Sequence, residues 1–552
     1  MKRMIIIDVG STTTKALLFT AQDDTWHYME RGEAATTVEA PFEDVQIGVG
    51  NAIRLLEERS GLPLYDSVAS HLLVDEFLMT SSAGGGLQIV VCGNLQSFTG
   101  DSARRAALGS GAIILDLFTT DDGRHHFHRL ERLRVLRPDM ILLAGGFEGA
   151  RDINFIIEMC DFIRYAKPKP KTGYRLSLPV VYAGASGARP IVEDLLGEEF
   201  IVQIVANLRP EVGVENSEPT RKAIHDLFVE HVMSSAPGYA DLQKLVTRPP
   251  LPTPNAVGEI LTRYARTTKQ NILCIDIGGA TTDVFSVHEG QYVRSVSANV
   301  GMSYSIGNVL AQAGAERILR WLPKTISLAQ FWRSVGAKQL HPTGIPATED
   351  DLLIEQAVAR EALRMAFNDH QELGTLEGSR SIVDSERVLG SAKLNIAKFD
   401  IIIGSGGILS NAPTRAQAAM MLIDALQPCG VTSLFVDSVF MLPHLGVFSL
   451  LDEAAALHVL QDDCLIPLGT VLAPLGQGRQ GSTVFSVQGQ SLGGENLRAE
   501  VAWGEILFLP LGKDETAEIE VQAHGGLRWE GSRRITVQGG LCGLILDARG
   551  RS

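Results

Sequence analysis

The chain of 552 residues has few cysteines, no excess of positive charge and no long apolar run. Its six cysteines form no CxxC pair, so the sequence supports neither a disulfide framework nor a cysteine-rich zinc site. The 64 aspartates and glutamates outnumber the 49 lysines and arginines, and the net charge of −15 offers no electrostatic footprint for nucleic acid. A local basic patch could still escape this count. No apolar run approaches the ~18 residues that a membrane span needs.

The N-terminus also lacks a secretory signal, because two basic residues lead into a short apolar run that ends at Asp8. Together these absences predict a cytoplasmic protein that binds neither nucleic acid nor membrane. The composition is that of an ordinary globular protein, with 45% hydrophobic and 20% charged residues. A chain of this length is expected to form several domains.

One short motif occurs twice. DVGSTTTK occupies residues 8–15, and DIGGATTD occupies residues 276–283, which is 268 positions later. Each copy follows an apolar run, MIII or ILCI, that is typical of a buried strand. A second strand, ALLFT or VFSVH, is expected after the turn.

A second pair of similar segments follows the first. PDMILLAGG places Asp139 six residues before Gly145, and FDIIIGSGG places Asp400 six residues before Gly406. The two landmarks are 131 residues apart in the first copy and 124 in the second. We therefore predict an internal duplication of a half-molecule, with a period far longer than that of any solenoid.

The rest of the chain alternates between strand-like and helix-like segments. DINFIIEMCDFIRYA, NAVGEILTRYART and LLIEQAVAREALRMAF have the apolar periodicity of amphipathic helices, so both halves are expected to be α/β. After Thr470 come short strand-like runs separated by Gly, Asn and Asp, which predict a β-rich domain. With the proline-rich segment 247–255 as a boundary, we predict domains at 1–255, 256–469 and 470–552.

The repeated turn has the residue types of a phosphate-binding loop. Its glycines let phosphate oxygens approach backbone N–H groups, and its hydroxyl side chains can donate further hydrogen bonds. Lys15 supplies a positive charge for a phosphate. Asp8 and Asp276 can each hold Mg²⁺, through waters because Mg²⁺ dehydrates reluctantly. Two such turns that face each other would clamp a polyphosphate from both sides.

These motifs resemble those of the actin, Hsp70 and sugar-kinase superfamily. DVGSTTTK is similar to its first phosphate loop, including the D-x-G-S-x-x-x-K spacing, and DIGGATTDV is similar to its second. IIIGSGGILSN, residues 401–411, resembles its adenosine motif. The resemblance implies an α/β fold, namely a duplicated actin-like (ribonuclease H-like) two-lobe ATPase fold with Mg-ATP between the lobes.

The resemblance also implies which residues act. Asp8, Asp276, Thr281 and Asp283 would be catalytic, and Asp8 and Asp276 would hold Mg²⁺. The residues expected to bind ATP are Gly10, Ser11, Thr12, Thr13, Lys15, Gly278, Gly279, Thr282, Gly404, Gly406 and Gly407. Two of these assignments have simpler alternatives, because Lys15 could be a surface lysine at a strand end and Asp283 could only cap a turn.

A narrower resemblance covers most of the chain. SSAGGGLQIVVCG, RPDMILLAGGFEGARD, VVYAGASGAR and the tail GGLCGLILDARGR are similar to the MutL family associated with glutamate mutase. That family is distinct from the mismatch-repair protein of the same name, and its members resemble reactivating factors of adenosylcobalamin-dependent enzymes. The resemblance implies an ATP-dependent chaperone that binds a cobalamin-dependent mutase. It would release damaged cobalamin from the mutase so that an intact cofactor can enter.

Three further motifs have ordinary structural interpretations. GQGRQG, residues 476–481, precedes a strand-like run and not the helix of a dinucleotide site, so we interpret it as a loop. HHFH, residues 125–128, is expected on a solvated helix face or loop and not at a metal. SSAGGG, residues 81–86, lacks the Lys-Ser/Thr of a P-loop and is expected to be a turn, with contact to the nucleotide or a partner as the alternative.

Other functions remain compatible with such an ATP site, because fold does not determine function. The alternatives are a small-molecule kinase, a subunit of an ATP-dependent hydantoinase or carboxylase, and a polymerising actin-like scaffold. A kinase needs an aspartate base beside a substrate hydroxyl, and no sugar site is visible in the sequence. The long insertions and the C-terminal β-rich segment make a scaffold less natural.

Overall fold

The computed structural model of the chain defines two compact units. It describes residues 2–551 apart from 11–12, 24, 39–41, 67–70, 83–86, 150–152, 171–176, 213, 234–236, 343 and 375–393. The first unit comprises the described residues up to Ile260, residues 373–374, and Leu442–Val459. The second comprises Leu261–Glu372 and the described residues from 394 to 441 and from 460 onward.

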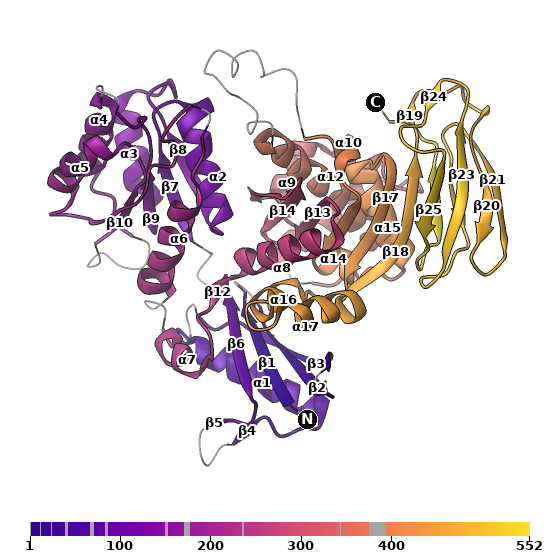
Figure 1. Cartoon of the computed structure of the whole chain (residues 1–552), viewed down its shortest axis with the longest axis horizontal. Helices are drawn as coiled ribbons and strands as arrows, with labels where there is room; N and C mark the ends of the chain where they lie inside the picture. The colour runs from indigo at the N-terminus through magenta and orange to yellow at the C-terminus, as the bar shows by residue number, and fades with distance from the viewer. Residues whose placement is uncertain are drawn as a thin grey trace. The chain divides into compact units, whose positions relative to one another are not determined.

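The first unit contains a mixed five-stranded sheet with the order β12-β6-β1-β2-β3 (Figure 1). Its strands are β1 (Lys2–Val9), β2 (Thr13–Gln22), β3 (Thr25–Ala35), β6 (Glu76–Ser81) and β12 (Leu251–Pro252). Strand β2 is antiparallel to both neighbours, whereas β6 is parallel to β1 and β12 is parallel to β6. The last six residues of β1 are buried, as expected for a central strand that is covered on both faces.

The second unit repeats this arrangement. Its corresponding strands are β13 (Ile272–Ile277), β14 (Thr281–His288), β15 (Gln291–Ala298), β16 (Ile401–Ser405) and β17 (Gly430–Asp437). They stand in the order β15-β14-β13-β16-β17, with β14 antiparallel to its neighbours and β16 and β17 parallel to β13. Counted within each half, both sheets have the strand order 3-2-1-4-5. The predicted fold class, a duplicated actin-like (ribonuclease H-like) α/β fold, is therefore confirmed.

A third sheet lies between β6 and β12 in the sequence. Its strands are β7 (Gln88–Cys92), β8 (Ile113–Phe118), β9 (Met140–Leu143), β10 (Pro179–Tyr182) and β11 (Ile201–Ile204). They are all parallel, in the order β11-β10-β9-β7-β8. Counted from β7, this is the doubly wound order 2-1-3-4-5. We call this part of the first unit the inserted domain.

Helices cover both faces of the inserted sheet (Figure 1). Val90 and Ile141 pack with α3 (His126–Leu136), α4 (Asn154–Ala166) and α5 (Arg189–Leu196). The alternate residues Ile89 and Leu142 pack with α2 (Asp101–Gly109) and α6 (Glu218–Leu227). Because side chains alternate along a strand, the continuously apolar strands β7 and β9 supply side chains to two separate apolar layers.

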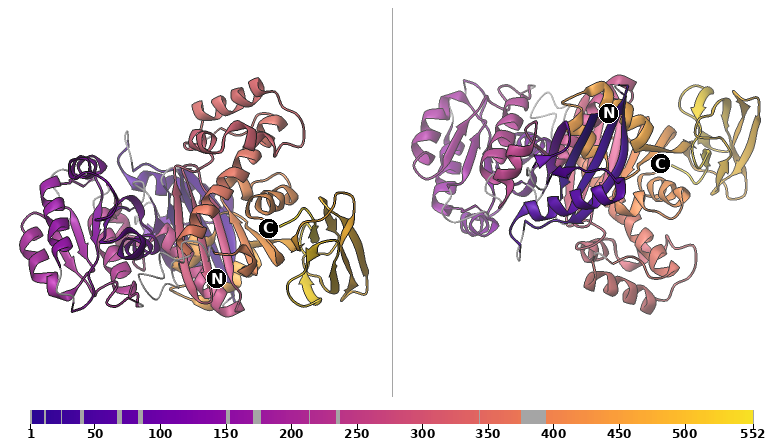
Figure 2. Two further views of the ribbon diagram at one scale, coloured as in Figure 1. Left: turned by 90° about the horizontal axis from the view of Figure 1, so that it is seen from above. Right: turned by 90° about the horizontal axis from the view of Figure 1, so that it is seen from below.

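The β-rich C-terminal region is also confirmed, but its described strands belong to three sheets, one of which is the short pair β19 (Leu475–Gly476) and β24 (Leu527–Arg528). The strands β20 (Thr483–Ser491), β21 (Asn496–Ala502), β23 (Thr516–Ala523) and β25 (Arg534–Gln538) form an antiparallel sheet of their own, drawn in yellow in Figure 2. By contrast, β18 (Leu465–Ala473), β26 (Leu544–Asp547) and β22 (Ile506–Leu509) extend the second unit's main sheet beyond β17. GQGRQG leads into β20, so a strand follows it, as predicted.

The predicted amphipathic helices are confirmed as α4, α8 (Thr253–Thr268) and α12 (Glu349–Gly374). The remaining helices named here are α1 (Val45–Ser60), α7 (Tyr239–Leu245), α9 (Ile306–Ala313), α10 (Ala315–Leu319), α11 (Leu328–Leu340), α14 (Gly407–Ser410), α15 (Arg415–Leu426), α16 (Leu442–Phe448) and α17 (Glu453–Val459). Within the described ranges, no helix has both the length and the apolar composition needed to cross a bilayer.

The second pair of sequence landmarks is not a product of the duplication. The segment after Asp139 forms β9 of the inserted sheet, whereas the segment after Asp400 forms β16 beside β13. The strand that corresponds to β16 is β6, which pairs with β1 as β16 pairs with β13. The true counterpart of Asp400 is therefore Asp75, and the similar spacing of 131 and 124 residues is coincidental.

A shared local device explains this error. In each case an aspartate precedes a strand, donates its backbone N–H to a carbonyl on the neighbouring parallel strand, and accepts that residue's own N–H with its carboxylate. The pairs are Asp75 with Arg3, Asp139 with Gln88 and Asp400 with Asn271, with carboxylate distances of 2.7, 2.9 and 2.8 Å. The device satisfies the first backbone groups of two parallel strands and occurs in each of the three described sheets that contain parallel strands.

Candidate nucleotide site

The first turn lies at the end of β1, where Asp8 is only 3% exposed. Two hydroxyl groups donate to its Oδ1 atom, from Thr80 at 2.8 Å and from Thr253 at 2.6 Å. Thr80 lies on β6 and Thr253 begins α8, so both neighbouring elements fix the carboxylate. Asp8 thus keeps an anionic group at the strand end in a fixed orientation.

The backbone of the first turn is tightly closed. Gly10 donates its N–H to the carbonyl oxygen of Thr13 at 3.1 Å, and an added Cβ at Gly10 would lie 2.7 Å from that oxygen. Thr36 donates its hydroxyl to the Gly10 carbonyl at 2.8 Å. Lys15 lies directly opposite Asp8 in the β1–β2 register. Two other residues predicted to bind ATP, Ser11 and Thr12, lie outside the described residues.

The second turn has the same backbone closure. Gly278 donates its N–H to the carbonyl oxygen of Thr281 at 2.9 Å, which is the Gly10–Thr13 bond repeated 268 positions later. The Gly278 carbonyl accepts the N–H of Met302 at 3.0 Å, and the Gly279 carbonyl accepts that of Ser303 at 2.9 Å. Half-buried Asp276 is the second-last residue of β13, as Asp8 is of β1.

Two side chains of the second turn are engaged inside the protein. Thr282 is buried and donates its hydroxyl to the carbonyl of Val300 at 2.8 Å. Asp283 lies opposite Asp276 in the register and accepts two hydrogen bonds from Arg294, at 2.9 and 2.6 Å. The Arg294 side chain is 2% exposed, so the Asp283 carboxylate compensates a buried positive charge.

The predicted adenosine segment begins at the end of β16. Gly404 lies in β16, Gly406 precedes α14, and Gly407 is the first residue of that helix. Gly406 has φ = +100°, and an added Cβ would lie 2.2 Å from the carbonyl oxygen of Ile277. Only glycine allows this close approach, which brings the start of α14 beside the end of β13.

Replacing Gly406 by alanine is expected to destabilise the protein by about 2 kcal/mol, because the new methyl group meets the Ile277 carbonyl and φ is positive. Gly407→Ala is the matched control, since the nearest atom to its added Cβ is 3.8 Å away. Thermal unfolding of both variants measures the difference. Equal midpoints would show that the Gly406 conformation is not required.

Sequence reasoning missed several polar side chains near these turns. Thr80 and Thr253 hold Asp8, and Tyr239 contacts Ser81 with its hydroxyl oxygen 2.5 Å from Oγ. Burial raises the pKa of Tyr239 well above its ordinary value, and the negative charge of Asp8 adds to the rise. The sequence alone could have identified Thr80, because aligning Asp75 with Asp400 pairs Thr80 with a residue of the adenosine segment.

That residue is Ser405, which lies opposite Asp276 as Thr80 lies opposite Asp8. Ser405 is 1% exposed, and its hydroxyl makes no hydrogen bond to any part of the chain that the structure describes. A buried hydroxyl beside a strand-end aspartate is a suitable hydrogen-bonding group for a ligand or a bound water.

The structure thus forms two sets of predicted residues, one in each unit. Asp8, Gly10, Thr13 and Lys15 surround the first turn. The residues of the second set are Asp276, Gly278, Gly279, Thr281, Thr282, Asp283, Gly404, Gly406 and Gly407. Carboxylate oxygens at two strand ends suit a hydrated Mg²⁺, and turns closed by glycine suit phosphate groups, so these residues fit Mg-ATP in their chemistry.

Comparison with known proteins identifies similar sequences. A family model described as MutL protein matches residues 4–464. Protein MutL of Clostridium tetanomorphum is 26% identical over 437 residues, which cover 74% of this chain and 86% of that protein.

Solved structures with a similar arrangement are more distant. Xylulose kinase from Lactobacillus acidophilus is 10% identical, with 86% of this chain and 94% of that chain covered and a TM-score of 0.33. A nucleotide-free diol dehydratase-reactivating factor is 9% identical, with 76% and 94% covered and a TM-score of 0.30. A nucleotide-free acetone carboxylase is 12% identical, with 90% and 80% covered and a TM-score of 0.32.

Proposed function

The chain belongs to the MutL protein family, and from this premise we propose that it is an ATP-dependent chaperone that reactivates an adenosylcobalamin-dependent mutase of the glutamate mutase type. The observation that carries the ATP part of the proposal is the repeated turn. Gly10–Thr13 and Gly278–Thr281 make the same backbone hydrogen bond at the end of the first strand of each half. In each half, an aspartate on that strand precedes the turn.

In this proposal both turns bind the same Mg-ATP. Asp8 and Asp276 hold Mg²⁺ through waters. The main chain from Gly10 to Thr13, with Lys15, binds phosphate oxygens from one half, and Gly278, Gly279, Thr281 and Thr282 bind them from the other. The main chain at Gly404, Gly406 and Gly407 contacts adenosine. Only bound ATP carries a γ-phosphate that both turns can contact at once.

Asp283 receives a different role from the one first predicted. Its Oδ1 atom already accepts both Arg294 hydrogen bonds, which ties β14 to β15. We propose that Asp283 positions the second turn and does not itself activate the hydrolytic water. Thr281 begins β14 and stays the candidate for contact with the γ-phosphate.

The chaperone part of the proposal rests on family membership and on the physics of ligand exchange. A mutase holds damaged cobalamin tightly, so a helper must bind the open form of the mutase better than the closed form. A ligand shifts a conformational equilibrium only by its differential affinity for the two states. ATP hydrolysis would then release the chaperone from the reopened mutase.

The test combines nucleotide binding with mutase recovery. Mg-ATP at a hundred times its dissociation constant is expected to stabilise the protein by about 2.7 kcal/mol in thermal unfolding. A mutase inactivated until it carries hydroxocobalamin should recover only with this protein, Mg-ATP and fresh adenosylcobalamin together. Recovery that is equal without ATP, or no recovery, would contradict the chaperone. ATP turnover that responds to a sugar or a hydantoin would favour a kinase or a carboxylase-type subunit.

A further inference from the structure

The inserted domain is tied to the first unit's β1–β6 region at both of its ends. The chain leaves that sheet at the end of β6, where Ser82 donates its N–H to the Val9 carbonyl at 2.9 Å. It comes back through Pro237, whose carbonyl accepts the Val45 N–H at 3.1 Å. We call residues 237–253, which lead from the inserted domain to the start of α8, the returning segment. The outgoing end is thus bonded to the residue after Asp8, and the returning segment to the first residue of α1.

The returning segment makes two further contacts at the strand end that carries Asp8. Tyr239, the first residue of α7, is 1% exposed, and its hydroxyl oxygen lies 2.5 Å from Oγ of Ser81. Ser81 in turn donates to the Val9 carbonyl at 3.3 Å. At the other end of the segment, Thr253 donates its hydroxyl to Oδ1 of Asp8 at 2.6 Å. The returning segment therefore fixes the residues that lead into the first turn.

The inserted domain also packs closely against the end of the returning segment. Gly111, between α2 and β8, has φ = +87°, and an added Cβ would lie 2.6 Å from Oδ1 of Asn255 and 3.2 Å from Cβ of Pro252. Pro252 immediately precedes Thr253. One cluster of buried apolar side chains includes residues of β1, β7 and α7, so the domain and the first sheet share a core. A shift of the domain would therefore displace the hydroxyl that holds Asp8.

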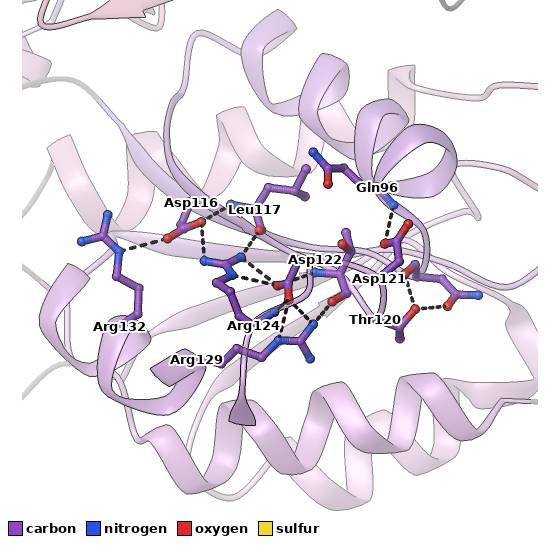
Figure 3. Close-up of polar contacts among 11 residues, drawn as sticks. Gln96, Asp116, Leu117, Thr120, Asp121, Asp122, Arg124, Arg129 and Arg132 are labelled. Atoms are coloured by element: carbon purple, nitrogen blue, oxygen red, sulfur yellow. Dashed lines mark hydrogen bonds and ion pairs between the residues drawn. The ribbon is translucent and has the colours of Figure 1, made fainter. Parts of the chain in front are cut away.

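Polar cross-links make the inserted domain stiff. Figure 3 shows that the Asp122 carboxylate is bonded to Arg124 and Arg129, with distances of 2.8 and 2.7 Å. Asp121 accepts the backbone N–H of Gln96 at 2.9 Å, which links the segment after β8 to the segment after β7. A satisfied polar network of this kind makes its surroundings rigid. The domain can therefore transmit a displacement of its outer parts to its contacts with the first sheet.

We propose that the inserted domain positions Asp8 and the first turn, with Tyr239 and Thr253 as the positioning residues, an inference that rests on the proposed binding of Mg-ATP. Residues that orient a metal-binding group typically change metal affinity or activity by about 10- to 100-fold when they are altered. A ligand that binds the inserted domain and shifts it then changes the affinity for Mg-ATP. Mg-ATP changes the affinity for that ligand by the same factor, because coupling between two sites is reciprocal.

Calorimetry of the full chain with ATP, in the presence of Mg²⁺ and in EDTA, tests the position of the domain. Gly111→Ala is expected to weaken Mg-ATP binding about tenfold, because the added methyl group displaces Pro252 and with it Thr253. Binding of ATP in EDTA should change much less, since Asp8 acts on the metal. Gly123→Ala is the matched control, because Gly123 lies in the same domain with φ = +70° and its added Cβ meets no atom of the described chain within 4 Å.

A second pair of variants separates positioning from folding. Tyr239→Phe removes only the hydroxyl that contacts Ser81, and should weaken Mg-ATP binding about threefold, as expected for one neutral hydrogen bond. Tyr182→Phe is its control, because Tyr182 of β10 is also fully buried and its hydroxyl donates to the Ala185 carbonyl at 2.8 Å. Both variants should lower the unfolding midpoint of the ligand-free protein by similar amounts, but only Tyr239→Phe should change the affinity for Mg-ATP.

The failure of this proposal can be told apart from that of the proposed function. If Gly111→Ala and Tyr239→Phe bind Mg-ATP as tightly as the wild type, the positioning role is wrong and the proposed function stands. If the two controls weaken binding equally, the effect comes from the stability of the domain, and the positioning role is again wrong. If binding in EDTA weakens as much as binding with Mg²⁺, the effect does not pass through Asp8. If the wild type binds no Mg-ATP, both proposals fail.

Discussion

Asp8→Asn is expected to lower ATP turnover by about a hundredfold without unfolding the protein. The change removes the negative charge at the end of β1, where the proposed site needs a ligand for hydrated Mg²⁺. Phosphoryl transfer is catalysed mainly by positioning and electrostatics, so a missing charge at the metal should affect the rate strongly. Asp276→Asn should act in the same direction from the other half.

The geometry explains why the fold should tolerate this substitution. Thr80 and Thr253 both donate to Oδ1 of Asp8, and an asparagine can present its carbonyl oxygen at the same position. The two hydroxyl bonds are then kept, and only the charge is lost. Asp8→Ala would instead leave two buried hydroxyls without their acceptor, and would confuse a catalytic effect with a stability effect.

The control is Asp23→Asn, because Asp23 is exposed in the turn after β2 and has φ = 51°, which asparagine also adopts. Turnover with saturating Mg-ATP and the thermal midpoint should be measured on all three proteins. If Asp8→Asn hydrolyses ATP at the wild-type rate, Asp8 does not serve the nucleotide or its metal.

A second large effect is expected at the C-terminal end of the chain. Asp547→Asn should destabilise the second unit by about 3–5 kcal/mol, because it leaves buried Arg551 and half-buried Arg549 without their counter-charge. Asp547 is fully buried on β26 and accepts hydrogen bonds from Arg549 at 2.9 and 2.8 Å and an ion pair from Arg551.

The network around Asp547 reaches two helices of the same unit. Arg549 also donates to Asp424 of α15 at 2.7 Å, and Asp424 accepts a second bond from Arg360 of α12, also at 2.7 Å. Three arginines therefore share two buried or nearly buried carboxylates. The tail motif DARGR is part of the resemblance to the MutL family. Its side chains link β26 to α15 and, through Asp424, to α12.

The pH dependence of this network has a definite sign. Burial by itself would raise the pKa of Asp547, but hydrogen bonds from Arg549 and the charges of Arg551 and Arg549 outweigh it and hold the pKa below its ordinary value of 3.8. A carboxyl with a lowered pKa stabilises the fold above its unfolded pKa, and this stabilisation is lost as pH falls through the folded pKa. The stability difference between wild type and Asp547→Asn should therefore shrink below pH 3.8.

Denaturant unfolding at neutral and acidic pH measures this effect. Asp514→Asn is the control, since Asp514 is an exposed aspartate in the same C-terminal region and should change stability little. A destabilisation of Asp547→Asn that does not depend on pH would show that shape, and not charge, is what the buried carboxylate contributes.

The sequence alone determined the parts of the protein that depend on neighbouring residues. The repeated turns were visible because a closed Gly–Thr turn after a strand needs glycine and hydroxyl residues at fixed local positions. The amphipathic helices α4 and α12 and the strands after Thr470 were visible for the same reason, since their periodicity is local. The duplication was visible as two such turns in a single chain, and the fold class came from their resemblance to the actin, Hsp70 and sugar-kinase superfamily.

Only the tertiary structure decided which strands become neighbours and which charges meet. Asp139 and Asp400 look alike in sequence because the same local device starts two parallel strands, but β9 and β16 lie in different sheets. Strand pairing depends on the whole core and on residues far apart in the chain, so local sequence cannot specify it. In the same way, nothing near Asp283 shows that its carboxylate binds Arg294 on the next strand. Thr253 likewise reaches Asp8 across 245 residues of sequence, because folding brings β12 beside β6.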